Sequence, residues 1–237
     1  MLKIENITKY YGKIKILDNI SFTVETGEIV GLVGPNGVGK TTLIKSISGL
    51  TKLKSGEAYI ENKSLLSSPC LGRYMLGCCF QDNIFDRFFN VYDTVFYNAM
   101  YHGMGYKIAK KATDDILHRL KLSEKCLSNG NQLSGGMKRR FQLAISLVHK
   151  PIVLILDEPT AGLDPKERVR FRDLIAEIGK DSIVLLSTHI VSDVEQIADW
   201  ILMMKDGQLI FDGARDEIGE GLEEFYLEQF EEVEHHA

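Results

Sequence analysis

The sequence predicts an α/β fold with a mostly parallel sheet, because short apolar segments alternate with polar loops and helix-forming segments. Three segments have the composition of buried strands: residues 28–33, 152–156 and 182–187. The first leads into a glycine-rich loop, the second into two carboxylates and the third into Thr188-His189. Since the carboxyl ends of parallel strands meet at one edge of a sheet, where ligands bind, the same segments also predict the position of a site.

The composition is that of a globular protein, because 44% of the 237 residues are apolar and 26% are charged. The net charge of −5 provides no basic field, so we expect no nucleic-acid partner. A membrane-spanning helix needs roughly 20 apolar residues, and the longest apolar segment, residues 152–156, is far shorter. The first six residues carry charges and no apolar core, which argues against a signal peptide.

The cysteines favour free, mostly buried thiols in a reducing cytoplasm. They form no C-x-x-C pair, and no histidines stand at zinc-ligand spacing near Cys70, Cys78, Cys79 and Cys126.

A glycine-rich loop follows the first predicted strand and matches G-x-x-x-x-G-K-[ST]. Leu43, Ile44 and Ile47 follow at helical spacing, and Gly49 is a stop signal. The motif therefore has its required context of strand, loop and helix. The residues predicted to bind a nucleotide here are Gly34, Pro35, Asn36, Gly37, Val38, Gly39, Lys40, Thr41 and Thr42.

The residue types in this loop suit phosphate chemistry. The glycines let consecutive backbone N–H groups turn toward a phosphate, and the following helix N-terminus adds partial positive charge. Lys40 is predicted to reach the β- and γ-phosphates, and the Thr41 hydroxyl to ligate Mg²⁺. ATP and Mg²⁺ are the predicted cofactors.

The second and third strands end in groups that complete such a site. Asp157 is predicted to bind the metal ion, directly or through water, and Glu158 to polarise the attacking water. The alternative role, capping the next helix, fits Asp164 better because Pro165 and Glu167 follow it. His189, after the third strand, is predicted to contact the γ-phosphate.

The segment 133–140 reads Leu-Ser-Gly-Gly-Met-Lys-Arg-Arg. Ser134 is a predicted helix N-cap, and a glycine pair at a helix N-terminus is a second anion site in the same chain. The segment resembles the signature motif of the ABC family, which in that family faces the ATP bound by the opposite subunit. Tyr11 resembles the aromatic residue that stacks on adenine, Gln81 the Q-loop residue, residues 161–164 the D-loop, and His189 the switch histidine.

The resemblance covers nearly the whole chain. It implies a single ABC ATP-binding domain over residues 1–237, with a RecA-like P-loop NTPase core (1–83 and 146–212) that begins with an antiparallel β subdomain. A helical subdomain (84–145), in which the sequence predicts helices at 91–101 and 108–120, is inserted in the core. The core is predicted to end in a hairpin of residues 200–204 and 208–211 around Asp206-Gly207, and an acidic helical tail (213–237) follows it.

The family also implies the activity: hydrolysis of ATP that drives transport, with export favoured, through separate integral membrane permease subunits. A second ATP-binding subunit completes each site, and the chain is expected at the cytoplasmic face of the membrane. The implied catalytic residues are Glu158, His189 and Gln81. The implied metal residues are Thr41, Gln81 and Asp157. The groups implied to act on the partner's ATP are Ser134, Gly135, Gly136 and Asp164.

Met137 is the one departure from the motif, because the family usually has Gln there and Met cannot donate its hydrogen bonds. We expect ATP binding between subunits to survive, since Ser134 and both glycines are retained. The form of the motif, with Gly162-Leu163-Asp164-Pro165, is similar to the branch that serves ABC-2 exporters of drugs, antibiotics and peptides.

Two segments leave alternatives open. The aromatic-rich stretch 80–89 suits either a buried core or, by resemblance, the surface that receives the coupling helix of a membrane subunit. The tail, residues 214–234, is expected to pack on the core. The alternative is a contact with a second ATP-binding subunit or with a membrane subunit.

Other P-loop proteins fit the sequence less well. ABC ATPases that act on ribosomes or DNA usually carry a second cassette or a long coiled-coil insertion, and this sequence has neither. A GTPase is disfavoured because residues 62–65, Asn-Lys-Ser-Leu, stop short of the guanine motif Asn-Lys-x-Asp.

Overall fold

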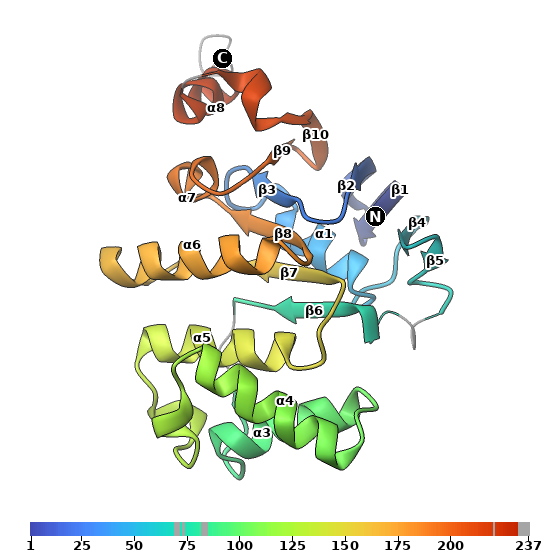
Figure 1. Ribbon diagram of the computed structural model, residues 1–237. Coiled ribbons are helices and arrows are strands. Elements are labelled where there is room, and N and C mark those ends of the chain that lie inside the picture. The colour runs from blue at the N-terminus through green and yellow to red at the C-terminus, as the bar shows by residue number, and fades with distance from the viewer. Residues whose placement is uncertain (69–71, 73, 82–84, 220, 232–237) are drawn as a thin grey trace.

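The centre of the fold is a six-stranded sheet (Figure 1). The computed structural model describes residues 1–68, 72, 74–81, 85–219 and 221–231. Strands β3, β8, β7 and β6 are parallel neighbours, β9 pairs in parallel with β3, and β10 pairs antiparallel with β9. The predicted, mostly parallel sheet is therefore confirmed. Its strands, in spatial order, are β10 (Gln208–Ala214), β9 (Trp200–Lys205), β3 (Ile29–Val33), β8 (Ile183–Thr188), β7 (Val153–Asp157) and β6 (Leu76–Cys79).

A separate antiparallel sheet forms the N-terminal part of the chain. Its first two strands alternate buried and exposed residues along much of their length, as expected for a sheet with one face on the core. This confirms the antiparallel subdomain that the family resemblance implied. In spatial order its strands are β2 (Ile14–Val24), β1 (Leu2–Tyr11), β4 (Ser55–Ile60) and β5 (Lys63–Ser64).

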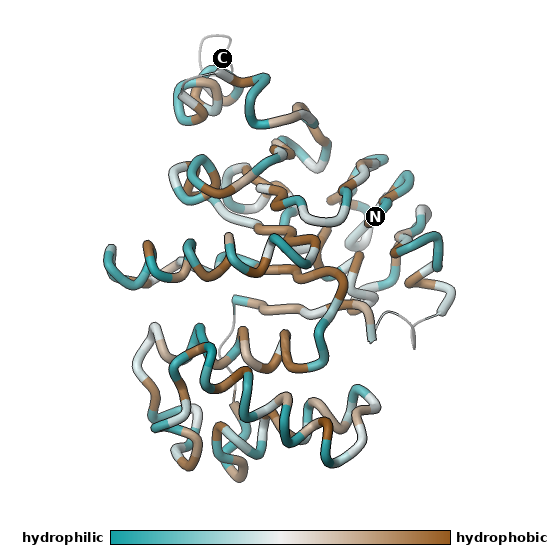
Figure 2. The backbone as a smooth tube through the Cα atoms, viewed as in Figure 1, coloured by the Kyte–Doolittle hydropathy of each residue, from teal (hydrophilic) through white to brown (hydrophobic). Residues whose placement is uncertain are grey.

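Helix α1 (Lys40–Ile47) lies between the two sheets, and its Leu43, Ile44 and Ile47 are fully buried in their shared core. On the opposite face of the central sheet, alternate residues such as Leu154 and Leu186 pack against the later helices. Figure 2 shows the most hydrophobic residues concentrated in the central strands. Both faces of the sheet are covered, which explains why its strands are continuous apolar runs.

Three helices form a group on one side of β6 and β7 (Figure 1). They are α3 (Val91–Tyr101), α4 (Tyr106–Arg119) and α5 (Gly135–Leu147). The predicted helix 91–101 is confirmed, and the one predicted at 108–120 spans 106–119 instead. The connection from α4 to α5 contains two short 3₁₀ helices, Ser123–Lys125 and Gly130–Gln132.

The remaining helices follow the strands of the second half. They are α6 (Pro165–Gly179), α7 (Val191–Glu195) and α8 (Leu222–Glu231), with a 3₁₀ turn at Arg215–Ile218. The predicted hairpin at 200–211 is confirmed, and its turn residues Asp206 and Gly207 both have positive φ, as a tight type I′ turn requires. No helix in the described part of the chain is long and apolar enough to cross a bilayer.

The acidic tail packs on the core, as expected. Leu222 at the start of α8 is fully buried, and the rings of Phe225 and Phe211 lie 5.2 Å apart. The Lys205 ammonium donates to the carbonyl of Gln229 at 2.8 Å. Residues 232–234 of the predicted tail lie outside the described residues.

Gly77 on β6 permits the close approach of helix α5. A Cβ at this position would lie 2.2 Å from the backbone oxygen of Ser146, which cannot move without the helix. We therefore expect Gly77→Ala to lower the free energy of unfolding by about 1–3 kcal/mol, the usual cost of overpacking. Urea unfolding measures this, with Gly105→Ala as the matched control, since a Cβ at Gly105 meets no atom within 4 Å. Equal stability of the two variants would contradict the prediction.

Candidate functional site

The glycine-rich loop connects β3 to α1 at the carboxyl edge of the central sheet. Gly39 is the N-cap of α1 with φ of 110°, and a Cβ there would meet the Ile16 carbonyl at 3.0 Å. Gly34 has φ of 158°, and its Cβ would lie 2.5 Å from the Met204 carbonyl. Backbone conformation and lack of space therefore both select glycine at these two positions.

The Lys40 side chain folds back over this loop. Its ammonium donates to the carbonyls of Gly34 at 2.7 Å and Pro35 at 2.9 Å. Burial lowers the pKa of Lys40, and the nearby carboxylates of Glu158 and Asp157 oppose that shift. The cation is thus held inside the loop, where an anionic group would bind.

A cavity of about 230 Å³ brings the loop together with residues from three distant segments. Gln81 enters it after β6, Glu158 after β7 and His189 after β8. The sequence prediction that these groups share one site agrees with this geometry. The cavity is lined by Asn36, Gly37, Gly39, Lys40, Thr41, Thr42, Gln81, Glu158 and His189.

Glu158 and His189 are in direct contact. Nδ1 of His189 lies 2.9 Å from the Glu158 carboxylate. Glu158 has a left-handed backbone with φ of 50°, and its N–H donates to the Ser187 carbonyl at 2.9 Å, which fixes the loop on β8. The Thr188 hydroxyl also donates to this carboxylate at 3.5 Å. Sequence reasoning missed Thr188, although its place before His189 on the strand was visible.

Asp157 is a buried carboxylate at the end of β7. It is 1% exposed, and within the described chain neither of its oxygens has a hydrogen-bond partner of acceptable geometry. Burial raises the pKa of Asp157, while the nearby hydroxyls of Thr41 and Ser187 and the ammonium of Lys40 act in the opposite direction. Unpaired carboxylate oxygens beside a threonine hydroxyl fit the oxygen ligands that a hard divalent cation prefers.

The residues predicted to act on a partner's nucleotide lie outside this cavity. Ser134 and Gly135 are exposed at the start of α5, and the Ser134 side chain accepts from the Met137 N–H at 3.4 Å, which confirms the predicted N-cap. Asp164 is exposed and caps α6 by accepting from the Glu167 N–H at 3.0 Å. The Glu167 side chain forms an ion pair with Arg170 at 2.7 Å.

Tyr11 is also not part of the cavity lining. It is half exposed at the end of β1, and the ammonium of Lys9 lies 4.9 Å from its ring centroid. Met137 is partly buried against the core of the helical group. Its predicted influence on the signature motif stays a prediction.

Arg139 makes a contact to the Gln81 loop that sequence reasoning missed. This arginine is 5% exposed on α5 and donates to the carbonyl of Gln81 at 3.2 Å and to the side chain of Gln142 at 3.1 Å. It therefore connects the helix of the signature segment to the loop that carries Gln81 into the cavity. Its place in the signature segment was the signal that could have found it.

The comparisons with known proteins agree with this geometry. The ABC transporter family model matches residues 17–161. This chain belongs to the ABC transporter family. It is an ABC ATPase, the ATP-binding subunit of an ABC transporter.

The similar proteins include ATP-binding proteins named for export or drug resistance. The Nod factor export ATP-binding protein I of Burkholderia lata is 36% identical over 88% of this chain and 69% of its own length. The linearmycin resistance ATP-binding protein LnrL of Bacillus subtilis is 32% identical over 92% of this chain and 70% of its own. The daunorubicin resistance ATP-binding protein DrrA3 of Streptomyces coeruleorubidus is 33% identical over 92% and 69%.

Solved structures extend the likeness to the whole fold. An ATP-binding subunit of an ABC transporter superposes with a TM-score of 0.88 at 27% identity, covering 96% of this chain and 98% of the other. A dimeric ATP-binding cassette in a post-hydrolysis state, bound to ADP and phosphate, has a TM-score of 0.81 at 26% identity, covering 91% and 99%. The expected combination of P-loop core, antiparallel sheet and helical insert is thus confirmed.

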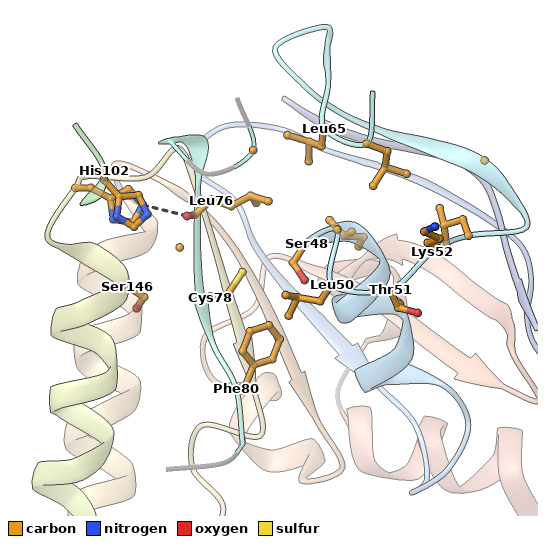
Figure 3. Close-up of a pocket in the computed structure, with 18 of the residues that line it drawn as sticks. Ser48, Leu50, Thr51, Lys52, Leu65, Leu76, Cys78, Phe80, His102 and Ser146 are labelled. Carbon is orange, nitrogen blue, oxygen red and sulfur yellow. Dashed lines mark hydrogen bonds between the residues drawn. The ribbon is translucent and has the colours of Figure 1, made fainter. Parts of the chain in front are cut away.

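A second, larger hollow of about 750 Å³ separates the end of α1 from the helical group (Figure 3). Figure 3 shows Ser48, Leu50 and Lys52 on one wall and His102 and Ser146 on the other, with Leu76 and Phe80 between them. We call this hollow the groove. Its floor is apolar, and both of its walls also carry polar groups.

The aromatic-rich stretch 80–89, of which Phe80 lines the groove, divides between the two predicted roles. Phe85 is 8% exposed and packs on Phe141 with ring centroids 4.7 Å apart, as a core residue does. Phe88 is 94% exposed, which suits a surface that receives a partner. Residues 82–84 lie outside the described part.

The cysteine prediction is correct in part. Cys78, Cys79 and Cys126 are free, but only Cys79 is fully buried, and Cys70 lies outside the described residues. Burial raises the pKa of both Cys78 and Cys79 to about 12, so neither is a thiolate near neutral pH.

His149 is a half-buried histidine in the wall of the groove. Its ring stacks on His102 at 3.8 Å, its Nε2 lies 3.0 Å from the Leu76 carbonyl, and its Nδ1 is buried with no partner among the described residues. Burial, followed by the effect of His102, lowers the pKa of His149 to about 4. The ring is therefore neutral in the folded chain at neutral pH.

The unfolded chain binds a proton at this histidine below about pH 6.5, while the folded chain does so only near pH 4, so stability falls as the pH drops through this window. We expect His149 to lower the free energy of unfolding by about 2 kcal/mol between pH 7.5 and pH 5. Urea unfolding of the parent and of His149→Gln measures this contribution. An identical pH dependence in the two proteins would refute it.

Proposed function

We propose that two copies of this chain, or one copy and a homologue, bind two ATP at their interface and drive export through membrane subunits. The observation that carries this proposal is a division of the site. The cavity collects the glycine loop, Glu158 and His189 of one chain, while Ser134 and Gly135 stay exposed elsewhere. A helix N-terminus is an anion site. This one lies outside the cavity that would hold the nucleotide of its own chain, so it is available to the nucleotide of a partner.

In this proposal each residue keeps its predicted role. The loop residues 34–42 and Tyr11 bind ATP, and Ser134, Gly135, Gly136 and Asp164 act on the ATP of the partner. Glu158 activates the attacking water, and His189 contacts the γ-phosphate. The proposed domain limits are those given by the family: a core over 1–83 and 146–212, with the helical insert at 84–145.

Thr41, Asp157 and Gln81 would hold Mg²⁺ in this site. The unpaired oxygens of Asp157 beside the Thr41 hydroxyl support this assignment. When bound, Mg²⁺ neutralises charge that develops on the phosphate oxygens. The chain itself positions the triphosphate with Lys40 and the loop N–H groups.

The membrane subunits would dock at the groove, at the cytoplasmic face of the membrane. The apolar floor formed by Leu76 and Phe80 supports this position. A similar cassette, cbiO1 of Clostridium perfringens, is part of the ABC transporter complex cbiONQ. Export is favoured because the similar proteins include a Nod factor export protein and two drug-resistance proteins.

The two-subunit site is tested by Gly135→Glu. A Cβ at Gly135 meets no atom within 4 Å, and a carboxylate in the first turn of a helix favours the helix, so folding is retained. The new charge repels the partner's γ-phosphate. In a Glu158→Gln background, which should accumulate the ATP-bound dimer, we expect light scattering to show a dimer with ATP for the parent background and a monomer after Gly135→Glu.

Gly105→Glu is the matched control, because Gly105 also stands at the start of a helix, as the N-cap of α4, and also has free space around it. It should dimerise as the parent background does. An ATP-dependent dimer that persists after Gly135→Glu would overturn the two-subunit site.

A further inference from the structure

We infer that Asp193 is a positioning residue, which fixes the loop bearing Glu158 and Asp164 to the helix that follows His189. This inference rests on the proposed function for the roles of those three residues. Asp193 lies on α7, four residues after His189, and is 1% exposed. A buried carboxylate is costly unless its partners are well placed, so its contacts define what it does.

The first partner belongs to the loop between β7 and α6. The hydroxyl of Thr160 donates to Oδ2 of Asp193 at 2.5 Å, and Thr160 is itself 1% exposed. Thr160 stands two residues after Glu158, and its carbonyl accepts from the Leu163 N–H at 3.2 Å. A shift of Asp193 is therefore transmitted to both ends of this short loop.

The other partners are two arginines of α6, the helix that Asp164 caps. Nη1 of Arg172 lies 3.0 Å from Oδ1 of Asp193, and Nε of Arg168 lies 4.0 Å from Oδ2. One carboxylate thus binds the loop before α6 and the helix itself. The cations offset the cost of burying the charge.

The helix that carries Asp193 is fixed at its other side. A Cβ on Gly31 of β3 would lie 2.0 Å from Cγ1 of Val194, so glycine allows α7 to press directly against the strand that leads to the phosphate loop. The Ile190 N–H donates to the Thr188 hydroxyl at 3.0 Å, which connects the start of α7 to the end of β8. His189 is held between these two attachments.

A purely stabilising role explains this arrangement poorly, because buried ion pairs add little stability compared with apolar residues of the same size. What the network adds is a fixed relation between two loops. One loop carries Glu158, which contacts His189 of the other, and its far end presents Asp164 to a partner subunit. Asp193 thereby fixes the position of Glu158 relative to His189.

The test is steady-state ATPase kinetics of Thr160→Val and Asp193→Asn, with thermal unfolding of each protein. Thr160→Val keeps the shape and removes the donor, and we expect kcat to fall by about ten-fold or more, the effect of one hydrogen bond to a charged group. The KM for ATP should stay within about two-fold, because neither residue lines the nucleotide cavity. Thr160→Ser, which keeps the hydroxyl, should restore kcat.

Glu177→Gln on α6 is the matched control for Asp193→Asn, since the ion pair that Glu177 forms with Arg119 is exposed on both sides. A kcat of Thr160→Val equal to that of the parent, while Glu158→Gln is inactive, would overturn this inference and leave the proposed function standing. A lowered melting temperature with unchanged kcat would likewise reduce Asp193 to a structural role. If Glu158→Gln itself hydrolysed ATP like the parent, the proposed function would be the part that failed.

Discussion

Glu158→Gln is expected to lower the rate of ATP hydrolysis by about 10²–10⁴-fold, the contribution of a positioned general base. The carboxylate lies in the cavity, 2.9 Å from His189, and an amide cannot accept a proton from water. Glutamine has nearly the same shape, so ATP should still bind with the affinity of the parent. Phosphate release measures the rate, and equilibrium binding of ATP measures the affinity.

Glu61→Gln is a matched control for this substitution. Glu61 is exposed in the turn between β4 and β5 and has the same backbone φ of 50° as Glu158. Any effect of placing glutamine in left-handed backbone is thus common to the two variants. Hydrolysis by Glu158→Gln at the rate of Glu61→Gln would show that another group activates the water.

Arg172→Leu is expected to destabilise the chain by about 3–5 kcal/mol, the cost of leaving a buried carboxylate without its main partner. For a domain of this size the melting temperature should fall by roughly 6–20 °C. Asp193 is almost wholly inaccessible to water, so solvent cannot take the place of the guanidinium. Urea unfolding and thermal unfolding measure the loss.

Arg170→Leu is the control on the same helix, because the Arg170–Glu167 ion pair is exposed on the arginine side and should contribute less than about 1 kcal/mol. Replacing Asp193 by leucine together with Arg172→Leu should recover part of the stability, since no buried charge then remains unpaired. Equal stability of Arg172→Leu and Arg170→Leu would mean that Arg168 or water compensates for Asp193.

The sequence predicted those parts of the site that are formed by residues contiguous in the chain. The glycine loop, the strand ending in Asp157 and Glu158, and the strand ending before His189 are each a local pattern with a fixed chemical meaning. Their meeting in one cavity followed from the parallel sheet, which brings the ends of β3, β7 and β8 to one edge. The antiparallel subdomain and the helical insert came from the family resemblance.

The parts that were missed depend on contacts between distant segments. Thr160 and Asp193 are 33 residues apart, and no local pattern links them. The bond from Arg139 to the Gln81 carbonyl spans 58 residues. The close approach of Val194 to Gly31 likewise depends on how a helix settles on a strand, which periodicity does not specify.

The exposed position of Ser134 and Gly135, away from the cavity, has a consequence for rate measurements. Under the proposed function a lone chain holds two unmatched halves of a site, so assembly of the isolated protein is a bimolecular step. Its ATPase rate per molecule then depends on protein concentration. Membrane subunits that hold two copies side by side replace that concentration by an effective concentration set by their own geometry, and the dependence disappears.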